Sequence, residues 1–156
     1  MKKLMIMVLT LGLLSCGASK TVRTAKHTLK GTWTLSNITY DRAGTYKIKL
    51  LDDASKDCFE GSSWQFIPNN NTGTYTINNS SCGIGERYFI FTIDEVDAQT
   101  GLYDFLLKPT DAKGKSETNQ GFRIKLSSLT ETTMQWQQTV MVGGSPFTIS
   151  MNFVKS

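Results

Sequence analysis

Apolar and polar side chains alternate with a period of two through the last third of the chain, and this pattern constrains the fold most strongly. Residues 122–127, 133–140 and 147–153 each show it. Because successive side chains of a strand point to opposite faces, each run predicts a strand with one buried and one solvated face. The turn Gly143-Gly144-Ser145-Pro146 predicts a hairpin between the last two strands.

The same period recurs earlier in shorter runs that are separated by turn residues. The runs cover residues 32–40, 46–50, 63–67, 72–77, 88–96 and 102–108. No window of helical length from Leu29 onward repeats apolar residues at the spacing of one helix face. A single helical turn is expected within residues 52–61. About eight sequential strands with short connections predict an all-β fold, either an antiparallel up-and-down barrel or a sandwich.

Composition and charge exclude two classes of protein. A hydrophobic fraction of 39% and an aromatic fraction of 10% are typical of a globular domain and unlike a disordered chain. The formal charge of +4 includes Lys2 and Lys3, which belong to the leader described next. The remaining charges are nearly balanced and scattered, so the chain lacks the clustered basic surface of a nucleic-acid-binding protein.

The first fifteen residues have the pattern of a signal peptide. Lys2 and Lys3 form a positive n-region, and residues 4–14 form an apolar run too short to span a bilayer as a helix. The run ends in Leu13-Leu14-Ser15-Cys16, which resembles the lipobox of bacterial lipoproteins. The resemblance implies that residues 1–15 are removed and that Cys16 is lipidated with acyl chains such as palmitate. The alternative is an ordinary secretory peptide with an incidental cysteine.

The lipobox resemblance also implies where the protein resides and how it is organised. Gly17 follows the cysteine, where an acidic residue would favour retention in the inner membrane. We therefore expect a cell-envelope protein anchored in the outer membrane. Residues 16–28 are small, polar and basic and predict a flexible tether. The folded domain is then expected over residues 29–156.

Cys58 and Cys82 are the two cysteines that remain after Cys16. An even pair in an oxidising compartment predicts a disulfide bond. The pair lacks the C-x-x-C spacing of a redox motif, and no cluster of histidines accompanies it as a zinc site would require.

Residues at the start of the predicted domain resemble those of the lipocalins. Gly31-Thr32-Trp33 matches their G-x-W motif, in which the tryptophan plugs the closed end of the barrel. The chain is also similar to the lipocalin-like lipoproteins of Bacteroidetes-type bacteria, which have a lipobox and a cysteine before a characteristic hairpin. In this chain the cysteine, the hairpin positions and a second cysteine after the hairpin are Cys58, Gly61, Trp64, Phe66, Asn71, Tyr75 and Cys82. The resemblance implies an eight-stranded lipocalin-like barrel with Gly31 and Trp33 as its plug motif.

Catalytic, metal and cofactor sites are not expected. The single histidine, His27, lies in the predicted tether, and no serine lies in a nucleophile elbow. Asp52-Asp53 and Asp94-Glu95 are read as solvated charges, because acidic residues are seldom buried. We therefore expect no enzyme activity.

The interior of such a barrel offers a candidate binding site for a small hydrophobic molecule. Six residues on the apolar faces are candidate ligand-lining residues, namely Trp64, Met134, Trp136, Gln138, Met151 and Phe153. Simple core packing explains the same residues. The sequence thus favours a membrane-anchored, monomeric binding protein. The alternative is a structural or protein-interaction module of the envelope with a filled core.

Overall fold

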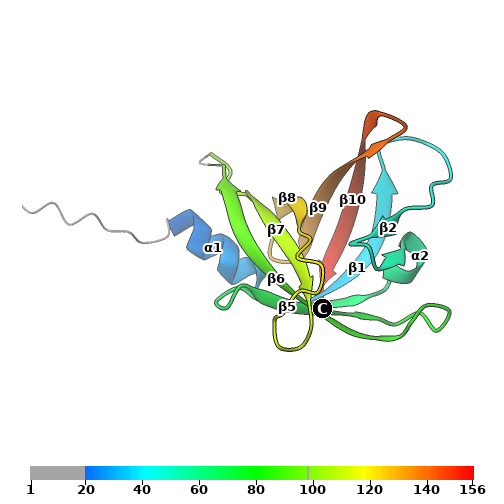
Figure 1. Ribbon diagram of the computed structural model, residues 1–156. Helices are drawn as coiled ribbons and strands as arrows, with labels where there is room; N and C mark the ends of the chain where they lie inside the picture. The colour runs from blue at the N-terminus through cyan, green and yellow to red at the C-terminus, as the bar shows by residue number, and fades with distance from the viewer. Residues whose placement is uncertain (1–19, 98) are drawn as a thin grey trace, which may run out of the picture.

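The computed structural model describes residues 20–97 and 99–156, so the predicted leader and Cys16 lie outside the described residues. Within those ranges, eight strands close into a barrel in the order β1-β10-β9-β8-β7-β6-β5-β4, and neighbouring strands pair antiparallel (Figure 1). The barrel strands are β1 (Gly31–Tyr40), β4 (Ser63–Ile67), β5 (Thr72–Ile77), β6 (Gly85–Val96), β7 (Tyr103–Thr110), β8 (Phe122–Leu129), β9 (Thr133–Val142) and β10 (Ser145–Lys155). The predicted antiparallel up-and-down eight-stranded barrel is confirmed.

The hairpin between β9 and β10 forms at the predicted turn. Val142 pairs with Ser145, which leaves Gly143 and Gly144 as the two turn residues. Their φ angles of 57° and 78° are the left-handed values that a two-residue hairpin turn requires and that glycine adopts without steric cost. The turn therefore fixes the register of the two strands.

The connection between β1 and β4 leaves the barrel wall and lies across one of its ends. It contains β2 (Lys49–Leu50), β3 (Ala54–Ser55) and the short helix α2 (Lys56–Phe59), and β2 pairs only with β3. We call residues 41–62 the mouth cover, and the barrel end beneath it the mouth. The run predicted as a strand at 46–50 therefore contributes β2 outside the barrel, and the expected helical turn is α2.

The disulfide bond between Cys58 and Cys82 is confirmed, with a Cα–Cα distance of 5.7 Å. Cys58 lies on α2 in the mouth cover, and Cys82 lies in the connection between β5 and β6. The bond therefore joins the mouth cover to the rim of the barrel.

The prediction of a flexible tether over residues 16–28 is wrong for most of its length, because α1 (Lys20–Leu29) is a helix. Val22, Ala25 and Leu29 are three and four residues apart, which places them on one side of a helix. Ala25 packs against the core and Leu29 is fully buried in it. Burial of this apolar side stabilises a helix that would be too short to persist in isolation.

Polar contacts hold α1 against the barrel end opposite the mouth. Lys26 Nζ donates to Pro68 O at 3.3 Å and to Asn71 Oδ1 at 3.1 Å, both in the turn between β4 and β5. Thr28 Oγ1 donates to Glu131 Oε1 at 3.4 Å, in the turn between β8 and β9. The helix thus lies across this end of the barrel, which we call the closed end. Figure 1 shows α1 and α2 on opposite sides of the barrel.

None of the helices in the described part of the chain is long and apolar enough to cross a membrane.

Candidate functional site

The motif predicted to plug the barrel lies at the end covered by α1. Trp33 is fully buried, and its Nε1 donates a hydrogen bond to Leu29 O at 2.9 Å. Gly31 has a φ of 122°, a backbone conformation that favours glycine. Lys155 Nζ lies 5.2 Å from the centroid of the Trp33 ring and donates to Thr28 O at 2.9 Å. The lysine therefore ties the last strand to both the tryptophan and the helix.

The six candidate ligand-lining residues lie together in the barrel interior, and all are buried. The rings of Trp64, Trp136 and Phe153 form a triangle, with centroid distances of 5.4, 5.6 and 4.9 Å. Trp136 Nε1 also donates to Met134 Sδ at 3.2 Å. The structure thus places these side chains in the packed core, and a ligand-binding role for them stays a prediction.

At the mouth, the cover inserts apolar side chains into the barrel. Leu50 and Leu51 from the mouth cover and Phe59 from α2 are buried in the same core cluster as the barrel residues. Leu51 and the neighbouring Asp52 have φ angles of 51° and 55°, which non-glycine residues adopt only at some cost in energy. Packing of Leu50 and Leu51 offsets this cost and closes the mouth.

An ion pair and a hydrogen bond attach the cover to the wall beside these leucines. Arg87 Nε donates to Asp53 Oδ2 at 2.9 Å, and Tyr75 Oη donates to the same oxygen at 2.9 Å. The guanidinium also donates to Gly85 O and Gly83 O, each at 2.6 Å, which fixes its position. Burial and the adjacent Asp53 carboxylate raise the pKa of Tyr75, so its hydroxyl stays protonated and can donate.

This network corrects the interpretation of Asp52-Asp53 as a pair of solvated charges. Asp52 is exposed, but the side chain of Asp53 keeps only 27% of its accessible surface and has two partners. Sequence reasoning missed the site because Asp53, Tyr75 and Arg87 come from separate segments. The side chains of Asp94 and Glu95 lie outside the described residues.

A cleft of about 340 Å³ opens beside the network, between the mouth cover and the loop that connects β7 to β8. Its apolar and aromatic lining comes from Leu51, Tyr75, Tyr88, Pro109 and Phe122. The rest of the lining is polar and comes from Asp52, Asp53, Arg87, residues 110–111, residues 116–118 and residue 120. Mostly apolar concavities with a few fixed polar groups are typical of small-molecule sites, and this volume lies at the lower end of their range. We call it the mouth cleft.

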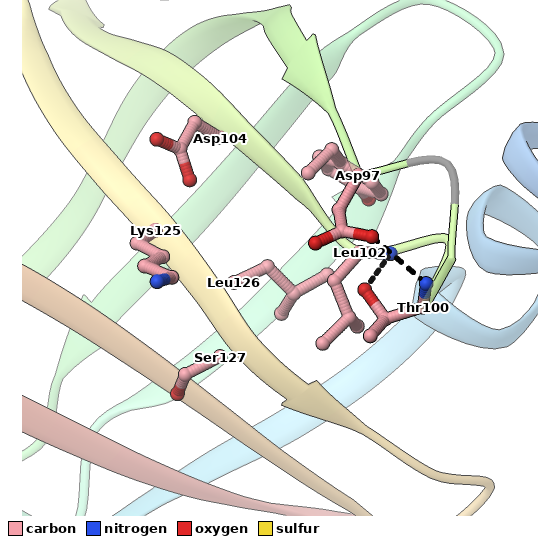
Figure 2. Close-up of a pocket in the computed structure, with 8 residues that line it drawn as sticks. Asp97, Thr100, Leu102, Asp104, Lys125, Leu126 and Ser127 are labelled. Atoms are coloured by element: carbon pink, nitrogen blue, oxygen red, sulfur yellow. Dashed lines mark hydrogen bonds between the residues drawn. The ribbon is translucent and has the colours of Figure 1, made fainter.

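A second hollow, of about 410 Å³, lies in the barrel wall between β7 and β8 (Figure 2). The ladder between the two strands ends at the pair Asp104–Lys125, although β8 continues to Leu129. Figure 2 shows its lining residues, with Lys125, Leu126 and Ser127 on β8 and with Asp97 and Thr100 on the turn after β6. Backbone N–H groups of Thr100 and Gln99, together with Lys125, hold the pKa of Asp97 below its usual value. We call it the wall hollow, and its rim is charged.

Two buried tyrosines differ in whether their hydroxyls have partners, and this difference predicts opposite effects of removing the hydroxyl. Tyr75→Phe should lower the free energy of unfolding by about 1.5 kcal/mol, because the bond to Asp53 is lost. Tyr103 lines the wall hollow, and its hydroxyl has no partner among the described residues. Tyr103→Phe should leave stability unchanged or raise it by up to about 1 kcal/mol. Urea unfolding of both variants checks this, and equal losses would contradict the assigned hydrogen bonds.

No group of three or more His, Cys, Asp or Glu side chains that could hold a metal ion occurs within the described ranges. Neither the mouth cleft nor the wall hollow is lined by any of the six predicted ligand-lining residues. The mouth cleft is therefore the candidate binding site that the structure adds to the sequence analysis.

Comparison with known proteins gives one family and one structure. The model of a family described as a lipocalin-like domain matches residues 29–136. A crystal structure of a lipocalin-like protein from Bacteroides uniformis is similar, with a TM-score of 0.49 and 10% sequence identity over 83% of this chain and 99% of that chain. None of the curated proteins compared with the chain matches it.

Proposed function

The chain belongs to the lipocalin-like domain family, and we propose that it binds a small hydrophobic molecule in the mouth cleft while anchored to the cell envelope as a lipoprotein. Lipocalin-like barrels are typically binding folds, and the barrel is consistent with a hydrophobic ligand. The observation that carries the proposal is the mouth cleft itself. It combines an apolar lining with the fixed Asp53–Arg87 pair, which could orient a polar head group.

The anchoring half of the proposal rests on the sequence around Cys16. The lipobox ends four residues before α1 begins. Acylation of Cys16 by two or more chains would hold the protein on a membrane stably, since each buried methylene contributes about 0.8 kcal/mol. Gly17 after the cysteine favours the outer membrane. Metabolic labelling with a radioactive fatty acid should label the wild-type chain and not a Cys16→Ala variant.

Filling the mouth cleft should weaken ligand binding strongly without affecting the fold. Thr118 lines the cleft and is exposed, so Thr118→Trp places an indole in the ligand's space. We expect the affinity for a fluorescent fatty-acid probe to fall about tenfold or more, equivalent to at least about 1.4 kcal/mol. Thr132→Trp is the matched control, because Thr132 is exposed in the turn between β8 and β9 at the closed end. Equal affinity in the two variants would place the probe outside the mouth cleft.

The packed interior supports a second candidate function, that of an envelope structural or protein-interaction module. Trp64, Trp136 and Phe153 fill the space that a deep ligand would need. Under this alternative, neither the probe nor a lipid would bind, and Thr118→Trp would change nothing.

A further inference from the structure

The net positive charge of the mature chain comes from α1 and the residue that follows it. Residues 20–30 contain four lysines and arginines, His27, and no acidic residue. Residues 31–156 contain the other 11 basic residues of the mature chain and all 13 acidic residues, which gives them a net charge of −2. The barrel is thus slightly acidic, and the helix across its closed end is basic.

One face of the helix presents this charge to solvent. Arg23, His27 and Lys30 are four and three residues apart, so they lie on one face, and all three are exposed. The N–H of Lys30 bonds to Lys26 O at 3.2 Å, so the helical turn extends to Lys30. The other side of the helix is occupied, because Leu29 is buried in the core. We call Arg23, His27 and Lys30 the basic face.

From this charge distribution we propose that the basic face of α1 docks on an anionic phospholipid surface. The proposal rests on the anchoring of Cys16 put forward above. Lys20 follows Cys16 by four residues, a separation of at most about 14 Å, so an anchor at Cys16 keeps the start of α1 close to the membrane. Electrostatic attraction acts over about 8 Å at physiological ionic strength, and basic side chains near an anionic bilayer gain from it.

The separation of charge also sets an orientation. An anionic surface attracts α1 and repels the acidic barrel, so the closed end faces the membrane. The mouth cover lies on the opposite side of the barrel from α1 (Figure 1). The mouth cleft therefore faces away from the membrane, open to the surrounding aqueous space.

The test uses the chain from Gly17, which lacks the lipid but contains every described helix and strand and the disulfide bond. Co-sedimentation is measured with vesicles of phosphatidylcholine alone and with vesicles containing 40% phosphatidylglycerol. We expect binding only to the anionic vesicles, and loss of binding at high salt. Arg23→Gln combined with Lys30→Gln should reduce partitioning about 25-fold, which is about fivefold for each basic residue.

The matched control is Lys113→Gln combined with Lys115→Gln, which removes the same charge from an exposed loop at the mouth. The control should partition as the wild type does. Equal losses in the two double variants, or equal binding to both kinds of vesicle, would overturn the proposal. Because the chain carries no lipid, neither result depends on acylation of Cys16, which the labelling experiment tests separately.

Discussion

Replacing Trp33 with alanine should lower the free energy of unfolding by about 4 kcal/mol, the cost typical of removing a buried aromatic side chain. The indole is fully buried, and its Nε1 donates to Leu29 O at the end of α1. Its loss would leave a cavity at the closed end and deprive Lys155 of the ring that it covers. Because Trp33 and Lys155 contact α1 through the carbonyls of Leu29 and Thr28, we expect the helix and this end of the barrel to lose stability together. Urea unfolding measures the loss of stability.

Two substitutions separate the contributions of this tryptophan. Trp33→Phe keeps an aromatic ring but removes the Nε1–Leu29 hydrogen bond, so it should cost less than alanine. Lys155→Met keeps the aliphatic stem while removing the ammonium group from Trp33 and Thr28. It should cost about 1 kcal/mol. A Trp33→Ala loss below about 1 kcal/mol would contradict its assignment as the plug.

Removing the disulfide bond should lower the free energy of unfolding by about 3 kcal/mol, because a cross-link restricts the unfolded chain. Cys58 and Cys82 are 24 residues apart, so the bond closes a loop of moderate length. It also joins α2 to the rim, so amide exchange should accelerate first in the mouth cover. The measurement compares a Cys58→Ala, Cys82→Ala double variant with the wild-type chain under oxidising and reducing conditions.

The double variant and the reduced wild type should unfold at the same lower denaturant concentration. Reduction should not destabilise the double variant further, since it has no bond between these positions to lose. Equal stability of the oxidised wild type and the double variant would show that the cross-link contributes nothing.

The barrel was predictable because its strands have strong local signals. β9 and β10 alternate buried and more exposed residues over most of their length, and two glycines with positive φ connect them. A side chain's face in such a strand follows from its position alone. The pairing of Cys58 with Cys82 was predictable for a different reason, because only two cysteines remained after Cys16.

Helix α1 was not predictable, because little of its stabilisation is local. Only Val22, Ala25 and Leu29 carry the helical period, among residues whose composition is that of a linker. Polar contacts that hold the helix come from distant parts of the chain, through Asn71 in the turn after β4 and Glu131 in the turn after β8. Tertiary packing of this kind is what stabilises most short helices.

The mouth cleft was not predicted, because none of the six predicted ligand-lining residues lines it. Alternation identifies which side chains point inward, but it does not distinguish a side chain that packs from one that lines a pocket. Core packing and pocket lining were therefore both open for Trp64 and Trp136 from the sequence, and the structure buries both side chains. The mouth cleft depends on how the mouth cover folds over the end of the barrel. Asp53 and Arg87 form an ion pair there although they are 34 residues apart in the sequence, so no local pattern predicts their contact.

Native mass spectrometry of the chain from Gly17, after incubation with a bacterial lipid extract, tests the central claim that the mouth cleft binds a small hydrophobic molecule. We expect the wild type and Thr132→Trp to carry an adduct of lipid or fatty-acid mass that is lost on denaturation, and Thr118→Trp to remain free. A clean mass for all three chains would contradict the claim and favour the filled-core interaction module.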